Sequence, residues 1–202
     1  MAYKNNRITL YLAFSLLLIF LSGCAGTIKH MRPVPPDKVV SSPEKGKALV
    51  VFMRPSGFAF AIQSSVFEVK DGKPSLVGIL AAKKKVAYQV EPGKHLFMVL
   101  SESADFMSAE LKPDKTYYAL VTPRMGMWKA RFSLKPVHRA ELHTSHFNDW
   151  LEACEWVEKS ADSDTWADAN MADIKNKYEE YYEVWMNKPI TDRPQLLPQD
   201  GK

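Results

Sequence analysis

The stretch "KVAYQVEPGKHLFMVL", residues 85–100, decides the fold class because it places two β-type runs on either side of a proline–glycine turn. In the first run the larger side chains Val86, Tyr88 and Val90 alternate with smaller or polar ones. A two-residue period of this kind is typical of a β-strand with one buried face. The proline–glycine pair between the two runs marks a turn.

The same alternation of short β-type runs and turn residues continues on both sides of this stretch. Asp71-Gly72 provides the positive-φ pair that a tight hairpin needs, and Pro113-Asp114 marks another turn. Strands at this spacing predict an antiparallel β-sandwich of seven or eight strands over residues 47–138. The predicted strands are residues 47–54, 61–69, 75–80, 85–90, 94–100, 108–112, 116–121 and 129–134.

Beyond residue 138 the apolar residues fall at helical spacing, so residues 139–188 are predicted to form a pair of α-helices. The whole chain is thus predicted to be α+β, and Pro189 begins an expected flexible tail over 189–202. We expect the second helix to pack on the first through Trp150, Leu151 and Cys154, and the pair to dock on the sandwich, since its apolar face is too large to be left in water. The predicted faces are Phe147, Trp150, Leu151, Cys154 and Val157 for the first helix, and Ala167, Met171, Ile174, Tyr178, Tyr181 and Trp185 for the second.

The chain begins with the three parts of an export signal. Lys4 and Arg7 form a basic start, an uncharged apolar run of 14 residues covers 8–21, and two small residues precede Cys24. A helix that spans a bilayer needs about 20 apolar residues, so the length disfavours the alternative of an uncleaved membrane anchor. We therefore expect residues 1–23 to be a removable signal peptide.

The seam "LSGC", residues 21–24, resembles the lipobox of bacterial lipoproteins. This resemblance implies that the Cys24 thiol carries a diacylglycerol and that the chain is cleaved just before Cys24. In a Gram-negative source, Ala25 resembles the residue that sends such proteins to the outer membrane. The expected location is therefore the periplasmic face of the outer membrane, with the lipid bilayer as the first partner.

Residues 24–46 carry four prolines and few apolar side chains, which is a composition typical of an extended linker. We expect this segment to be a tether between the lipidated Cys24 and the β domain. Fully extended, it would reach about 70 Å.

The β segment resembles a group of bacterial lipoprotein domains of unknown function that are similar to small PEGA-type and transthyretin-like sandwiches. The resemblance lies in "VVFMRPSGF" (50–58), "VEPGKHLFMV" (90–99) and "LKPDKTYYALV" (111–121). It implies a fold and a compartment but no activity. Asp114-Lys115 stands where the turn of such domains often contains a glycine.

Charge and cysteine content exclude several classes of function. Removal of the signal peptide lowers the formal net charge from +4 to +2, which is too small to indicate a nucleic-acid partner. Once Cys24 is modified, only Cys154 remains, so no intramolecular disulfide is expected. We expect Cys154 to be an inert packed thiol.

The densest set of candidate metal ligands is His138, His143 and His146, with Glu141 and Asp149 among them. Their spacing matches no zinc signature, and a solvated connector is the alternative interpretation. No nucleophile motif and no phosphate-binding glycine loop is present. The prediction is accordingly that the chain has no catalytic, cofactor or metal site and serves as a binding or envelope-structural module. The alternatives are an accessory subunit of an envelope complex and an enzyme that uses these histidines.

Three further groups of residues remain open between a structural and a binding role. Lys83–Lys85 is expected either to end a solvated hairpin or to contact anionic head groups. Glu152, Glu155 and Glu158 are expected on the wet face of the first helix. Trp156 departs from the apolar face of its helix and is a candidate contact for a partner, as are the aromatic residues of "GFAFA" (57–61).

Overall fold

The structure is a computed structural model that describes residues 28–124 and 131–202. Within these residues, eleven strands form two mostly antiparallel sheets, and three α-helices accompany them, so the fold is mixed α+β. The strands are β1 (Met31–Pro33), β2 (Ala48–Arg54), β3 (Ser64–Lys70), β4 (Lys73–Leu80), β5 (Lys84–Val90), β6 (Gly93–Leu100), β7 (Ala104–Leu111), β8 (Thr116–Arg124), β9 (Arg131–Pro136), β10 (Glu155–Lys159) and β11 (Gln195–Leu196). The helices are α2 (Ser145–Glu152), α3 (Ser163–Ala169) and α4 (Met171–Met186), with 3-10 turns η1 (Pro36–Lys38), η2 (Glu141–His143), η3 (Ile190–Asp192) and η4 (Pro198–Asp200).

One sheet has the strand order β1-β10-β5-β2-β8-β9, and the other has the order β11-β7-β6-β3-β4. The two sheets pack face to face, and Phe52 of β2 meets Phe97 of β6 edge-on, with their ring centroids 5.1 Å apart. The stretch 85–100 crosses between the sheets, because β5 belongs to the first and β6 to the second. This crossover holds the two layers together through one short turn.

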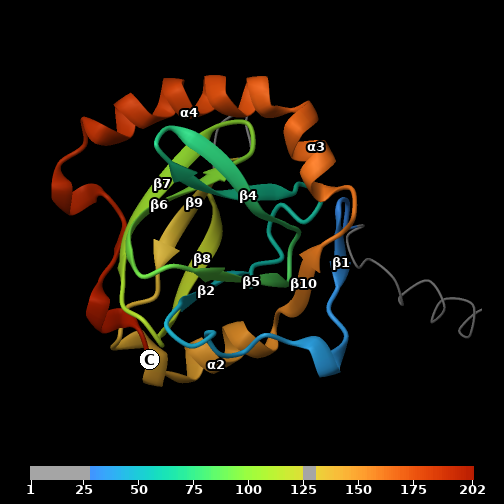
Figure 1. Ribbon diagram of the computed structural model, residues 1–202, viewed down its shortest axis with the longest axis vertical. Helices are drawn as coiled ribbons and strands as arrows, with labels where there is room; N and C mark the ends of the chain where they lie inside the picture. The colour runs from blue at the N-terminus through green and yellow to red at the C-terminus, as the bar shows by residue number, and fades with distance from the viewer. Residues whose placement is uncertain (1–27, 125–130) are drawn as a thin grey trace, which may run out of the picture.

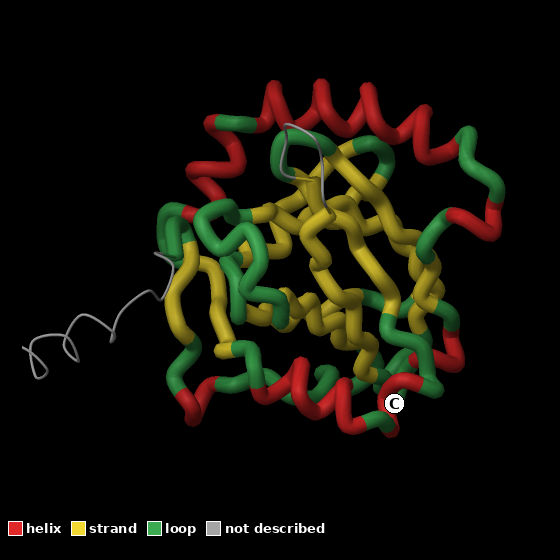
Figure 2. The backbone as a smooth tube through the Cα atoms, turned by 180° about the vertical axis from the view of Figure 1, so that it is seen from behind, coloured by secondary structure: helices red, strands yellow, loops and turns green. Residues whose placement is uncertain are grey.

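Helices cover the outer faces of both sheets, so the molecule has four layers. Figure 1 shows α4 along one side, α2 on the opposite side and the two sheets between them. The view from behind in Figure 2 shows the same arrangement. All seven residues of β2 are buried, because its inner face meets the other sheet while Leu49, Val51 and Met53 meet the layer that contains Phe147 of α2. A strand covered on both faces has a continuous apolar run in place of an alternating one.

The eight strands predicted from the β-type runs are confirmed, with shifts of a few residues at their ends. Asp71 (φ 50°) and Gly72 (φ 71°) form the turn between β3 and β4, in which Lys70 pairs with Lys73. Asp114 adopts a φ of 57°, which is the left-handed conformation that glycine favours. The aspartate therefore takes the place of the expected glycine in that turn, and its carboxylate accepts a hydrogen bond from the Gly46 backbone N–H at 2.7 Å.

The prediction of one helix from Phe147 through Val157 is wrong. Thr144 caps α2 by accepting a hydrogen bond from the Phe147 N–H, but the helix ends at Glu152, and the chain then extends as β10 between β1 and β5. Pairing with two strands satisfies the β10 backbone, and Val157 enters the core between the sheets while Trp156 packs on the outer cluster. The helical spacing of Cys154 and Val157 is thus incidental, and tertiary pairing overrides it.

The second predicted helix exists as two, because the chain breaks at Asn170 between α3 and α4. Its apolar face is buried as predicted, with Ile174 at 1% exposure and Trp185 at 5%. The expected docking on the sheets is confirmed, because this face packs on β7, but the expected packing on the first helix is wrong. The ring of Phe106 in β7 contacts those of Tyr178, Tyr182 and Trp185. The helices are therefore not a hairpin but two separate covers on opposite faces.

Both segments that were expected to be loose contribute strands. Pairing of β1 with β10 starts at Met31, which is 5% exposed in the core, so the predicted tether is shorter than residues 24–46. At the other end, β11 runs parallel to β7 and its Leu196 is fully buried, so 189–202 is not a flexible tail. Tyr117 and Lys115 lie so close to Gly201 that a Cβ there would come within 2.6 Å of the Tyr117 ring.

The predicted signal peptide and Cys24 lie outside the described residues. Among the helices of the described part of the chain, none combines the length and apolar character that crossing a membrane requires.

We predict that Ile174→Ala lowers the free energy of unfolding by about 2 to 5 kcal/mol, because it removes a buried aliphatic side chain between α4 and the sheet. Glu179→Ala, on the exposed face of the same helix, is expected to cost less than about 0.5 kcal/mol. Urea titration of both variants measures the difference. Equal, small losses would show that α4 does not cover the sheet in solution.

Candidate functional site

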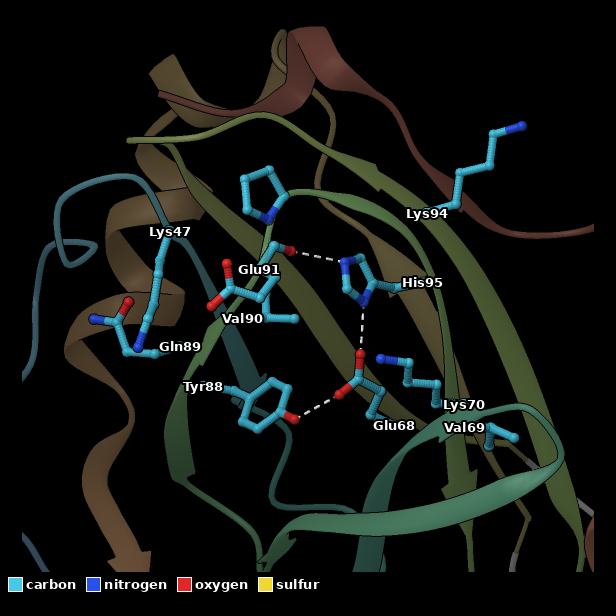
Figure 3. A pocket seen from close by; sticks show the side chains of 11 residues that line it. Lys47, Glu68, Val69, Lys70, Tyr88, Gln89, Val90, Glu91, Lys94 and His95 are labelled. Carbon is cyan, nitrogen blue, oxygen red and sulfur yellow. Dashed lines mark hydrogen bonds and ion pairs between the residues drawn. The ribbon is translucent and has the colours of Figure 1, made fainter.

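A polar pocket lies where the two sheets part, beside the crossover from β5 to β6. Its volume is about 410 Å³, and Figure 3 shows the side chains that surround it. Its lining combines residues of β3, β5 and β6, two residues of the turn between β5 and β6, and one residue that precedes β2. These are Lys47, Glu68, Val69, Lys70, Tyr88, Gln89, Val90, Glu91, Pro92, Lys94 and His95.

Three of these side chains form a hydrogen-bonded triad. The Glu68 carboxylate accepts from the Tyr88 hydroxyl and pairs with Nδ1 of His95, each at 2.6 Å. The other ring nitrogen of His95, Nε2, lies 2.8 Å from the Glu91 carbonyl oxygen (Figure 3). Because both ring nitrogens face oxygen acceptors, both bonds form only when each nitrogen carries a hydrogen.

The triad stands on the inner faces of three strands because of strand register. Glu68 pairs with Phe97 across β3 and β6, so the two side chains share a face, and the inward-facing Phe97 marks it as the inner one. His95 lies two residues before Phe97 and stacks on its ring at 6.0 Å, while Tyr88 meets the same ring edge-on at 6.4 Å. Phe97 therefore forms the apolar floor on which the triad rests.

Partial burial makes this triad electrostatically significant. The Glu68 side chain is 16% exposed and that of His95 is 11% exposed. The hydrogen bond from His95 lowers the pKa of Glu68 below its usual range, the bond from Tyr88 adds to this, and burial opposes both. Burial, reinforced by the bond to Glu68, raises the pKa of Tyr88. Glu68 is thus held as a carboxylate and Tyr88 as a neutral phenol.

Further charged side chains lie around the triad. Both Glu68 oxygens are occupied by fixed donors, so this carboxylate organises its neighbours. Lys47, Lys70 and Glu91 line the same pocket, and Lys47 also pairs with Glu44 at 2.6 Å, whereas the Lys94 side chain points away from the triad in Figure 3. The described residues that line the pocket include no serine, threonine or cysteine that would act as a nucleophile. Cationic groups around an internally satisfied triad favour a ligand that carries negative charge.

The connector histidines do not assemble into a site. His138 lies 3.0 Å from an Asp200 oxygen and faces the C-terminal segment. His143 and His146 are exposed, and His146 pairs only with Asp149, at 3.8 Å on the same helix. Within residues 28–124 and 131–202, no three His, Cys, Asp or Glu side chains gather to hold a metal ion. The enzyme alternative based on these histidines lacks the convergence that it requires.

The prediction that Lys83–Lys85 is solvated is correct for Lys83 alone. Lys84 is 5% exposed and pairs with Glu155, while Lys85 is 7% exposed and donates to the Leu151 carbonyl at 2.5 Å. Burial lowers the pKa of Lys85. Lys85 thus holds the end of α2, and Lys84 the start of β10, against β5, and their role is structural.

The remaining candidates have structural partners. Glu152 is exposed as expected, but Glu158 is half-buried and pairs with Arg32 at 2.9 Å. Trp156 is half-buried under Lys85, whose ammonium lies 4.6 Å from the ring centroid. Cys154 is 4% exposed, and burial raises its pKa to about 11, so the thiol is packed as expected although it lies on no helix.

The triad is not predicted from the sequence. The alternating pattern predicts only a strand position for Tyr88, and His95 falls within the predicted strand 94–100. The signal that could have found the site is Glu68, a lone carboxylate within the apolar run of β3. An inward-facing charge in such a strand requires partners, but the crossover that brings them together is not visible in a linear pattern.

Comparisons with known proteins identify no family. No family matches the chain in a scan of known protein families, and no curated protein matches its sequence. Among solved structures, the chain is similar to a protein from Eubacterium rectale studied by NMR, with 11% identity over 46% of this chain and 89% of that one, at a TM-score of 0.27.

We predict that Glu68→Gln makes the free energy of unfolding depend less steeply on pH in the acid range. The folded-state pKa of Glu68 is lowered, so its contribution is fully present above the ordinary value of 4.5 and is lost as the pH falls through the lower folded value. The wild type should therefore lose stability between about pH 5 and pH 3 more steeply than Glu68→Gln does. Urea titrations across this pH range test the expectation.

Glu179→Gln is the matched control, since Glu179 is exposed on α4. Its free energy of unfolding should fall with decreasing pH as steeply as that of the wild type. Parallel curves for all three proteins would mean that the triad does not hold Glu68 as a carboxylate.

Proposed function

We propose that this chain is a lipid-anchored envelope lipoprotein, attached through Cys24 to the periplasmic face of the outer membrane, whose domain is a binding module. The observation that carries the proposal is one of sequence and fold together. The predicted export signal ends at the "LSGC" motif, and a strand of the domain starts at Met31, only seven positions after Cys24. A lipid on Cys24 would thus hold the domain close to a membrane surface.

The length of the apolar run supports separation of the signal peptide from the domain. The run 8–21 is shorter than a membrane span, which agrees with a removable segment. Two or three acyl chains on Cys24 would anchor the domain firmly, because each buried methylene contributes about 0.8 kcal/mol.

The pocket at the β5–β6 crossover supports a binding role over an enzymatic one. The Glu68 triad is partly buried and satisfied within itself, and Lys70 lies beside it in the pocket lining. We propose that the module binds a small ligand with an anionic group at the rim of this pocket. A binding site with a fixed polar interior and a charged edge needs no nucleophile, metal or cofactor to act.

Cys24→Ala tests the anchor. The thiol is the attachment atom, so the variant should remain unlipidated and uncut at this position. The expected result is loss of metabolic palmitate label and loss of partition into detergent. Ser22→Ala, which preserves a small residue before the cysteine, is the matched control and should behave as the wild type. Unchanged lipid label in Cys24→Ala would refute the lipoprotein proposal.

Charge reversal at the pocket rim tests the binding role. Protein extracted from membranes under native conditions is denatured, and the small molecules released are compared by mass spectrometry. Lys70→Glu should deplete an anionic compound that the wild type releases, because it places a negative charge at the rim. Lys175→Glu, an equivalent change on exposed α4, should leave it unchanged. Identical compounds from all three proteins would exclude this pocket as the site.

A further inference from the structure

The loop between β2 and β3 exposes three large apolar side chains within five residues. Phe58 is 55% exposed, Phe60 60% and Ile62 37%. Most large apolar side chains of the described residues are buried or half-buried, so a group of three at one loop is a local concentration. We call Phe58, Phe60 and Ile62 the aromatic loop.

The exposure of the aromatic loop is fixed by a buried cation beneath it. The Arg54 side chain is fully buried at the end of β2, and its guanidinium donates to the carbonyl oxygens of Phe58 at 3.1 Å, Ala59 at 2.7 Å and Ile62 at 2.5 Å. Burial lowers the pKa of Arg54 to about 10, which leaves it charged at neutral pH. Because these carbonyls face inward to the guanidinium, the loop is held in place and its rings remain outside.

The aromatic loop lies next to the place where the described chain begins. Arg54 also donates to the Leu80 carbonyl at 3.2 Å, and the neighbouring Ile79 N–H contacts the Met31 sulfur at 3.3 Å. Ile79 and Leu80 are adjacent in β4, and they contact Met31 and Arg54, respectively. Arg54 is the residue that holds the aromatic loop. Ile28 and Ala59 pack on the same core. Figure 1 shows β1 beside β10 at this edge, with its start near α3.

Covalent reach limits how far this edge can stand from Cys24. Met31 is seven positions after Cys24 in the chain, and Ile28 is four positions after it. Fully extended, these segments span at most about 25 Å and about 14 Å. Any acyl chain on Cys24 therefore lies within that reach of the edge that carries the aromatic loop.

Charge at this edge also fits a membrane surface. Lys83 is exposed, and its backbone N–H donates to the Arg54 carbonyl at 2.8 Å, which places it beside the base of the loop. Lys29 is exposed on the segment that leads to β1. The exposed carboxylates of Glu155 and Asp162 at this edge are paired, with Lys84 and His30. An exposed lysine beside aromatic side chains favours an interface with anionic lipid, in which the rings enter the head-group region and the ammonium group meets phosphates.

We infer that the aromatic loop inserts into the lipid bilayer beside the anchor, so that the domain docks on the membrane through this edge. The inference rests on the proposed lipid anchor at Cys24. Phe58, Phe60 and Ile62 enter the interfacial region, and Arg54 keeps the loop in its inserted shape. Anchor and loop together make two contacts with the bilayer and thereby fix the orientation of the domain.

The test places an environment-sensitive fluorophore on the loop of the full, lipidated chain. Phe60→Cys is labelled in protein extracted from membranes and reconstituted into vesicles of phosphatidylethanolamine and phosphatidylglycerol. Cys154 is 4% exposed and Cys24 is expected to be alkylated, so the new thiol reacts selectively. Val184→Cys on α4 is the matched control, since Val184 and Phe60 are both 60% exposed.

The expected result is that the probe at Phe60 shifts its emission to shorter wavelength and loses intensity when the lipids carry a quencher on their acyl chains. The probe at Val184 should emit as in water and be insensitive to that quencher. Flotation with vesicles is measured on the same samples. Loss of flotation overturns both the anchor and the insertion.

If the protein floats with the vesicles but the probe at Phe60 emits as in water, the insertion is overturned and the anchor stands. A short-wavelength emission that lipid quenchers do not reduce also overturns it, because the loop would then be covered by protein. Equal quenching at Phe60 and Val184 would contradict a defined docking edge.

Discussion

Burial of the core between the two sheets is the constraint on which the rest of the structure depends. This core is closed by segments from both ends of the described chain: Met31 enters from β1, and Leu196 enters from β11. The middle of the chain supplies the facing rings of Phe52 and Phe97. Because remote segments complete a single core, the linker and the tail that their composition suggested are parts of the folded domain.

Two polar arrangements mark the ends of this core, and both depend on it. At one end the Glu68 triad rests on the ring of Phe97, where water meets the gap between the sheets. At another, the buried guanidinium of Arg54 lies 4.6 Å from the centre of the Phe132 ring and binds carbonyls of the loop that follows β2. A buried charge is tolerated only where such partners are complete. The candidate pocket and the aromatic loop therefore both lie at the border between the apolar core and polar groups.

The strands could be predicted from the sequence because their signals are local. Asp71-Gly72 and the alternation of Val86, Tyr88 and Val90 determine a turn and a strand within a few residues. The predicted burial of Ile174 and Trp185 was also correct, since a large apolar face requires a cover. What covers it is a question of topology, and helical spacing cannot distinguish β7 from α2.

The errors share one physical cause, which is pairing between distant segments. Residues 155–159 follow a helical spacing, yet β10 forms because β1 and β5 offer backbone partners on both sides. Lys84 and Lys85 were expected in water but are buried because their ammonium groups reach Glu155 and the Leu151 carbonyl. The Glu68 triad joins three strands, so no single stretch of sequence contains it. Contacts between distant segments cannot be predicted from the sequence of one segment alone.

We propose that this domain works at a membrane surface, to which a lipid bonded covalently to Cys24 attaches it. The most direct test is the intact mass of the protein extracted from the membranes of cells that produce the full chain. The account predicts a chain of residues 24–202 with the added mass of a diacylglycerol, and of a further acyl group where the host supplies one. A mass equal to unmodified residues 1–202, or to a fragment without lipid, would contradict it.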